Sequence, residues 1–170
     1  MRFDRNRYSV DAKAANRPVT VHAYADRVVI REGGEMVAEH ARAFGRDQTI
    51  FEPWHYVPAL ARKPGALRNG APFRDWEPSP TLDQVRRRLG TGDDADRQFV
   101  DILVAAREFG LEPVEVASAE ALAAGPCTSA IILNILARHR QPAPTPPVAT
   151  PETLALTIAP AADCARTTAC

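Results

Sequence analysis

The residues best suited to a chemical role are arginines and lysines that lie among aromatic side chains. Within residues 45–76, both tryptophans of the chain, Trp54 and Trp76, stand among five cations and further aromatic rings. A planar guanidinium donates paired hydrogen bonds to a phosphate, and an aromatic ring contacts a sugar or a base. This stretch predicts a surface for a polyanion, and a proline-stiffened hinge packed on a neighbouring element explains it equally well.

More arginines lie in the N-terminal third of the chain, where strands are predicted. On a small barrel they could line one face and meet phosphate, or they could be a scattered solubilising surface. The candidate anion-binding residues of both groups are Arg7, Arg17, Arg27, Arg31, Arg42, Arg46, Trp54, Arg62, Lys63 and Arg68. Trp54 is also well suited to a core with few aromatic residues.

A catalytic set is not found. The chain has no glycine-rich phosphate loop, no HExxH and no GxSxG motif. Its four histidines have no cysteine or histidine at ligand spacing. The acidic residues of 93–101 could form a two-metal site, but a predicted helix begins there and its dipole favours carboxylates. No catalytic or metal-binding residue is therefore assigned.

The charges are unevenly distributed along the chain. The formal net charge is zero, yet residues 1–75 carry 13 Lys and Arg against 9 Asp and Glu, and residues 76–139 carry 6 against 10. A polyanion should therefore meet the first half. The three cysteines match no zinc or redox spacing, and no signal or membrane segment is found, which predicts a cytoplasmic protein.

The first elements that must position these residues are short strands. An entering strand is predicted at the N-terminus, followed by alternating β-branched and polar residues over 17–42. A turn is expected at Ala25-Asp26, and Gly33-Gly34 is typical of a two-residue hairpin turn. Strands of this length predict a small antiparallel β-barrel over residues 1–48, within an α+β fold.

A connector is predicted over residues 49–78. Thr49 to Glu52 has the spacing of a capping box with Pro53 as the first helical residue, so a short helix should run over about 53–62. Pro58 should break or kink that helix. From Gly65 onward, proline, glycine and asparagine predict an extended, irregular segment.

Helices should occupy residues 79–139. Apolar spacing predicts a helix that begins at Ser79-Pro80, a second that Asp93, Asp94 or Asp96 caps, and two more over 113–124 and about 128–139. Short loops between them fit a small antiparallel bundle. Residues 140–170 contain too much proline and too little bulk to pack, which predicts a disordered tail.

Five blocks of the chain together carry a family resemblance. RFDRNRYSV, VTVHAYADRVVI, AEHARAFGRDQTIFEPWHYVPALARKPGALRNGAPF, DRQFVDILVAAREFG and ILNILARHR resemble, in order, the C-terminal part of IstA-type bacterial insertion-sequence transposases. These belong to the DDE transposase and retroviral-integrase-like superfamily. The resemblance covers residues 2–165, and it implies an SH3-like barrel followed by C-terminal helices.

The resemblance also implies a function in DNA transposition. Full-length members use Mg²⁺ on an Asp, Asp, Glu set, which should lie upstream of Met1, so activity of this chain alone is uncertain and no cofactor is expected in it. The chain should then bind transposon-end or target DNA through the candidate residues and help to assemble transposase subunits. An IstB-type AAA+ ATPase is a further possible partner.

Two alternatives stay open. The chain could be a protein-interaction module for transposase subunits or the AAA+ helper, without contact to DNA. It could also be an inactive gene remnant.

Overall fold

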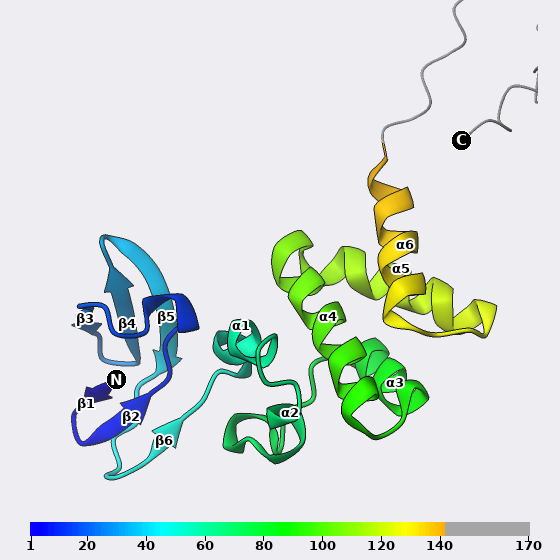
Figure 1. The fold of residues 1–170 in the computed structure, drawn as a ribbon. Helices are drawn as coiled ribbons and strands as arrows, with labels where there is room; N and C mark the ends of the chain where they lie inside the picture. Colours follow the sequence, from blue (N-terminus) through cyan, green and yellow to red (C-terminus); the bar gives the residue numbers. More distant parts are fainter. Residues whose placement is uncertain (142–170) are drawn as a thin grey trace, which may run out of the picture. The chain divides into compact units, whose positions relative to one another are not determined.

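The computed structural model describes residues 1–141, in which short strands come first and the longer helices last (Figure 1). The strands are β1 (Arg2–Phe3), β2 (Asn6–Tyr8), β3 (Thr20–Ala23), β4 (Arg27–Glu32), β5 (Glu35–Ala41) and β6 (Thr49–Ile50). The helices are the 3₁₀ turns η1 (Ala12–Ala14), η2 (Pro53–Tyr56) and η3 (Ala71–Phe73), and α1 (Val57–Leu60), α2 (Ala66–Asn69), α3 (Pro80–Leu89), α4 (Asp93–Phe109), α5 (Leu111–Ala124) and α6 (Ser129–Arg140). The predicted α+β class is confirmed.

β1 and β2 form a tight antiparallel hairpin that pairs Arg2 with Arg7. Asp4 and Arg5 make the turn, and both have positive φ angles, 48° and 64°, as the central residues of a type I′ turn do. The sequence predicted only one entering strand here. Since neither turn residue is glycine, the residue types gave no indication of the hairpin.

β6 adds to this hairpin as a parallel partner of β2, pairing Thr49 with Arg7. The predicted capping box is therefore wrong, because Thr49 lies in a strand. Glu52 caps η2 instead, and its carboxylate accepts a hydrogen bond of 3.3 Å from the Trp54 N–H. A two-residue strand is too short to show an alternating pattern in the sequence.

The second sheet has the order β3-β4-β5, with both pairs antiparallel. The hairpin predicted at Gly33-Gly34 is confirmed, with φ angles of 58° and 92° that glycine adopts without strain. The turn predicted near Asp26 is also confirmed, because it joins β3 to β4. These two turns were visible in the sequence through residue types that tolerate positive φ or bend the chain.

A closed barrel is not confirmed, because the strands of residues 1–50 pair into two separate three-stranded sheets. Both sheets contribute to one small core, which includes Tyr8, Val28, Ile30 and Ala38. The buried Asn6 side chain supplies hydrogen bonds to the segment before β6, where no strand pairing is present. It donates to the carbonyl oxygens of residues 43 and 45, at 3.0 and 2.9 Å, and accepts from the N–H of residue 48 at 3.0 Å.

The short helix predicted over 53–62 is divided in the structure. It begins as η2, with Pro53 in the first turn, and continues as α1 up to Leu60. Pro58 does not break it, because Pro58 lies in the first turn of α1, where its missing N–H costs no hydrogen bond.

Residues 65–78 are not the extended segment that was predicted. They include α2 and η3, and the side chains of Leu67 and Phe73 are buried. Trp54 and Trp76 contact each other edge to face, with ring centroids 5.5 Å apart, and both pack on the helical core. Burial of these apolar groups explains why a segment with many turn residues folds into short helices.

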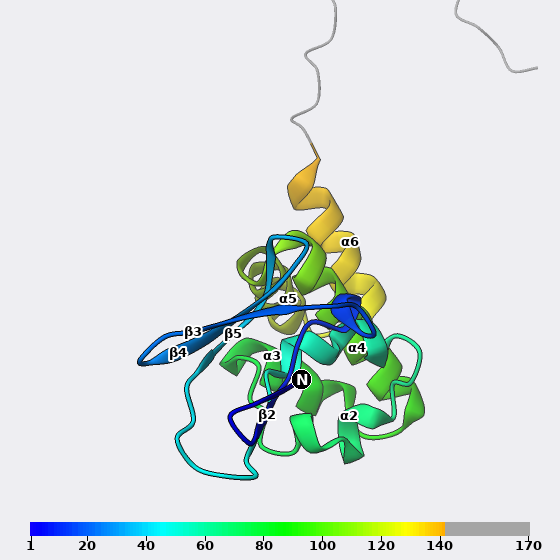
Figure 2. The ribbon, with the colours of Figure 1, turned by 90° about the vertical axis from the view of Figure 1, so that its left-hand side faces the viewer.

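The helices α3, α4, α5 and α6 confirm the predicted helical region (Figure 2). Ser79 caps α3 by accepting a 3.2 Å hydrogen bond from the Leu82 N–H, as predicted. α4 is capped by Gly92, and the nearby aspartates lie in its first turn instead of at the cap. The core of these helices is mainly aliphatic, with Phe99 of α4 as its buried ring, and it includes Val85, Ile102, Val114 and Ile132. None of the helices described is long and apolar enough to span a membrane.

The boundaries drawn at residues 48, 78 and 139 stay predictions. The predicted disordered tail falls almost entirely outside the described residues.

Candidate nucleic-acid interface

Arg2, Arg7 and Thr49 lie side by side on one face of the first sheet. The strand register sets Arg2 opposite Arg7 and Arg7 opposite Thr49. Successive residues of a strand point to opposite faces, and Asn6 and Tyr8, which flank Arg7, are buried. Arg7 is exposed. The outer face of this sheet therefore presents two guanidinium groups and one hydroxyl group in a row, and we call Arg2, Arg7 and Thr49 the cationic row.

A hollow of about 500 Å³ opens beside this row. Its walls are formed by Met1, Arg2, Arg7, Tyr8, Ser9, Thr49, Phe51 and Tyr56. Phe51 follows Thr49 by two residues and is 39% exposed. Its ring meets the ring of Tyr56 at an angle of 66°, with centroids 6.1 Å apart. The hollow therefore joins a cationic side to an aromatic side.

The hollow has no negative charge of its own. None of its lining residues is Asp or Glu. Among the ion pairs of residues 1–141, none involves Arg2 or Arg7. Like charges directly opposite each other on two strands destabilise the pair. A bound anion between Arg2 and Arg7 would remove that repulsion.

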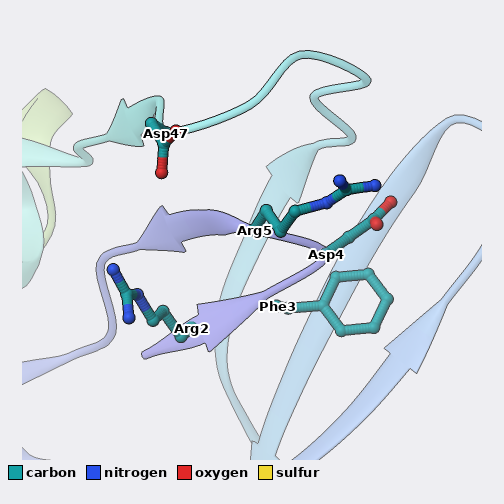
Figure 3. Close-up of a pocket in the computed structure, with 5 residues that line it drawn as sticks. All are labelled: Arg2, Phe3, Asp4, Arg5 and Asp47. Carbon is teal, nitrogen blue, oxygen red and sulfur yellow. The ribbon is translucent and has the colours of Figure 1, made fainter.

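A neighbouring hollow at the β1–β2 turn has a different character. It measures about 380 Å³ and is lined by Arg2, Phe3, Asp4, Arg5 and Asp47 (Figure 3). In Figure 3, Asp4 and Arg5 extend from the turn, and Arg2 extends from β1 away from them. Because carboxylates and guanidinium groups alternate here, this hollow offers an anion less than the first one does.

Four of the ten predicted anion-binding residues are neutralised by acids. The ion pairs are Arg17 with Glu32 at 3.2 Å, Arg27 with Asp26 at 3.4 Å, Arg42 with Asp4 at 3.6 Å, and Arg68 with Asp96 at 2.6 Å. Arg31 donates to the Gly34 carbonyl oxygen at 2.9 Å. These contacts reduce what the five arginines can offer to a phosphate.

The other predicted residues are spread over several elements. Arg7 lies in the cationic row, Arg46 is exposed in the loop before β6, and Arg62 and Lys63 are exposed after α1. Trp54 is half-buried against Trp76 and lines no hollow with the arginines described above. The structure therefore does not gather the ten predicted residues into one site.

One close grouping among them lies at the end of the second sheet. Arg42 donates to the Tyr24 carbonyl oxygen at 2.9 Å and stands 5.3 Å from the centroid of the Phe44 ring. Arg27 stands 4.8 Å from the centroid of the Tyr24 ring. Phe44 is 76% exposed. We call Tyr24, Arg27, Arg42 and Phe44 the aromatic–arginine patch.

Sequence reasoning missed Arg2 and did not select Phe51 and Tyr56 as site residues. Arg2 reaches Arg7 only through the tight turn at Asp4 and Arg5, which the residue types do not reveal. The spacing of Thr49 and Phe51 would have placed both on one face if β6 had been recognised.

A second polar cluster joins β2 to the segment that begins the helices. The Ser9 hydroxyl lies 2.9 Å from His55 Nδ1 and accepts a 2.8 Å hydrogen bond from the N–H of residue 52. His40 Nε2 lies 2.7 Å from the Ser9 carbonyl oxygen. Arg107, from α4, donates to the Trp54 carbonyl oxygen at 2.8 Å and pairs with Asp11. We call Ser9, Asp11, His40, His55 and Arg107 the junction cluster.

The junction cluster shifts the titration of two of its groups. Burial lowers the pKa of His55, and the charge of His40 lowers it further. For Asp11, burial acts to raise the pKa, but hydrogen bonds from the Lys13 N–H and from Arg107 outweigh it, so the pKa is lowered. A neutral His55 and a charged Asp11 suit the hydrogen bonds that they make.

Comparisons with known proteins identify the relatives of this chain. A family model described as "Mu transposase, C-terminal domain" matches residues 1–52. A transposase of Aminobacter aminovorans is 40% identical over an alignment of 172 positions, and the alignment covers 96% of this chain. The chain is related to transposases. A transposase for insertion sequences IS1326/IS1353, from Pseudomonas aeruginosa and from Shigella flexneri, is 37% identical over an alignment of 166 positions that covers 95% of this chain.

The chain spans about one third of the length of these transposases, 33% of the first and 32% of the other two. The family match ends at residue 52, so it contains both sheets and every residue of the ~500 Å³ hollow except Tyr56. No solved structure matches the chain.

The resemblance implies Mg²⁺ ions for a full-length transposase, and the carboxylates at the start of α4 are the acidic group of this chain that could be compared with such a site. Arg68 pairs there with both Asp93 and Asp96, and its Nε lies 2.6 Å from Asp96 Oδ2. This guanidinium already neutralises the oxygens that a metal ion would need. No group of three or more His, Cys, Asp or Glu in the part of the chain described here is arranged to hold a metal ion. These residues therefore do not fit Mg²⁺.

Proposed function

We propose that this chain is a non-catalytic C-terminal portion of an IstA-type transposase, which binds transposon-end or target DNA and contributes to transpososome assembly. The observation that carries the proposal is the row of Arg2 and Arg7, two opposed guanidinium groups with no acidic partner among the described residues. The relatives named as transposases support the same role.

The chemistry of the row suits a phosphodiester backbone. A guanidinium group donates two hydrogen bonds to a phosphate in a fixed planar geometry. Opposed residues of an antiparallel pair have Cβ atoms roughly 5 Å apart, so Arg2 and Arg7 can hold the same phosphate or two adjacent ones. Thr49, beside Arg7, adds a hydroxyl donor. Contacts of this kind position a protein on DNA without reading its sequence.

Partners follow from the same proposal. Transposon-end or target DNA would bind at the cationic row, and other transposase subunits would pack on the rest of the surface. An IstB-type AAA+ ATPase is proposed as a further partner on the resemblance alone.

The test compares two double substitutions in the full chain by fluorescence anisotropy with a labelled duplex over a range of salt concentrations. Arg2→Gln with Arg7→Gln should weaken duplex binding roughly tenfold and reduce the slope of log K against log salt by about 2, because two phosphate contacts are lost. Arg17→Gln with Arg27→Gln removes the same charge from acid-paired arginines and should change the slope less. Equal effects of the two pairs, or binding that ignores salt, would contradict the proposal.

The aromatic–arginine patch favours a second candidate, a protein-interaction module without contact to DNA. Its two arginines are paired with acids, so the patch attracts DNA weakly, whereas exposed tyrosine, phenylalanine and arginine are typical of protein interfaces. A pull-down with the AAA+ helper and a duplex shift assay on the same preparation separate the candidates. The second candidate is favoured if the unaltered chain captures the helper but does not shift the duplex, and if Phe44→Ser no longer captures the helper.

A further inference from the structure

We infer that the ~500 Å³ hollow binds one unpaired nucleotide, with its phosphate at Arg2 and Arg7 and its base on the ring of Phe51. This inference rests on the proposed function and specifies the form of DNA that the site takes. The recognised ligand is a nucleotide in a single-stranded segment or one turned out of a duplex.

The ring of Phe51 is the first part of the argument. It lines the hollow together with Thr49 and is 39% exposed, although contact of an apolar ring with water is unfavourable. The Phe51 ring contacts the Tyr56 ring edge to face, with an angle of 66° between the two ring planes. Such a contact supports the ring from one side and leaves ring surface open to the hollow.

The support beneath Phe51 continues into the helical core. The Tyr56 ring meets the Phe73 ring at 79°, with centroids 6.3 Å apart, and Phe73 is buried. The Phe73 ring in turn contacts the Trp76 ring, with centroids 5.6 Å apart. A ring held by a chain of packed rings loses little freedom when a base stacks on it, which favours binding.

The shape and charge of the hollow complete the argument. Its volume of about 500 Å³ falls in the range of sites for small ligands, large enough for one nucleotide. Inside a duplex, each base is stacked on both faces, so it cannot also lie on Phe51. Unpaired bases stack readily on aromatic side chains, and arginines beside the ring hold the backbone. The ring therefore binds the base and the two arginines bind the phosphate, and together they recognise an unpaired nucleotide.

The main experiment measures the affinity of the full chain for a labelled oligothymidylate and for a blunt duplex by anisotropy at one salt concentration. Phe51→Leu keeps an apolar side chain but removes the ring. It should lower oligothymidylate affinity about 5- to 100-fold and leave duplex affinity unchanged. Phe44→Leu, which removes an exposed ring outside the hollow, should leave both affinities unchanged.

The outcomes separate this inference from the proposed function. If Arg2→Gln with Arg7→Gln weakens binding of both DNA forms and Phe51→Leu weakens neither, the inference is overturned and the proposed function stands. If the chain binds no DNA at low salt, the proposed function fails. The inference then fails with it.

Competition and cross-linking test the site without relying on a folded variant. Thymidine monophosphate should displace the oligothymidylate at lower concentration than inorganic phosphate does; equal displacement would show that the ring takes no part. A phosphotyrosine peptide that displaces it better than the nucleotide would assign the hollow to a protein partner and overturn the inference. Bromodeoxyuridine-substituted single strands should cross-link the unaltered chain at Phe51 or Tyr56, and cross-links confined to other segments would contradict it.

Discussion

Asn6 holds the first sheet to the segment that leads into β6. Its side chain is fully buried and makes three hydrogen bonds to backbone groups of residues 43, 45 and 48. Among the described residues, no other side chain bonds to these three backbone groups. Asparagine at this place therefore acts like a short piece of strand.

Replacing Asn6 should destabilise the chain strongly. Asn6→Ala leaves two carbonyl oxygens and one N–H without partners, which should lower the free energy of unfolding by about 2–4 kcal/mol. Urea unfolding followed by circular dichroism measures the change. Asn134→Ala, at an exposed position of α6, is the control and should stay within about 0.5 kcal/mol. If Asn6→Ala also lowers the free energy of unfolding by no more than about 0.5 kcal/mol, water replaces the hydrogen bonds of Asn6.

Arg68 was predicted to bind DNA, yet its contacts point to a structural role. It pairs with Asp96, whose side chain is only 8% exposed. Arg68→Gln should lower the free energy of unfolding by about 1–3 kcal/mol, because it leaves a nearly buried carboxylate without its cation. Adding Asp96→Asn should recover part of that loss. Weaker DNA binding by Arg68→Gln, with unchanged unfolding, would restore the predicted role.

At the scale of elements, the junction cluster makes the join between β2 and the first helical turns sensitive to pH. Burial holds the pKa of His55 below its ordinary value of 6.5 in the folded chain. The unfolded chain therefore binds more protons as the pH falls below about 6.5, and stability falls with it; above that value the contribution is complete. The groups that face His55 are His40, Glu52, Asp11 and Arg107.

The His55 prediction is measured by urea midpoints above and below pH 6.5. The unaltered chain should lose stability on acidification, and His55→Asn, which keeps a group able to bond Ser9, should show a flatter dependence on pH. An identical pH dependence in the variant would assign the effect to other groups, with His40 the next to test.

The sequence predicted the elements that have a regular pattern or special turn residues. α3 to α6 follow from apolar spacing, and the β4–β5 hairpin follows from Gly33-Gly34. β1, β2 and β6 are two or three residues long, so no period can be detected in them. The candidate site depends on those three strands. For that reason Arg7 alone among the predicted residues belongs to it.

At the scale of the whole described region, two cores are joined by the hydrogen bonds of the junction cluster and by the packed rings of Phe51, Tyr56 and Phe73. One core lies between the sheets and the other among the helices and the connector. Arg107 bridges them by bonding Asp11 and the Trp54 carbonyl oxygen. Which residues pair across such a join depends on the complete fold, and the sequence offers no local pattern for a contact between residues 11 and 107.

Arg107 should therefore control how cooperatively the two cores unfold. Both tryptophans pack on the helical core, so their fluorescence reports on that core, and hydrogen exchange of β4 and β5 reports on the other. In the unaltered chain the two signals should change together, whereas Arg107→Ala should separate them. Arg97→Ala, an exposed arginine of the same helix, is the control. Coincident transitions in Arg107→Ala would show that the cores are coupled by other contacts.

The tip of the β4–β5 hairpin is a suitable place to attach a probe. Nothing lies within 4 Å of the position that a side-chain carbon would take at Gly33 or Gly34, and both residues are exposed. Neither glycine lines the hollow beside Arg2 and Arg7. Exposed loop tips tolerate insertions well, so a short peptide tag inserted there, with both glycines kept because of their positive φ angles, would report on the chain while leaving the cationic row free.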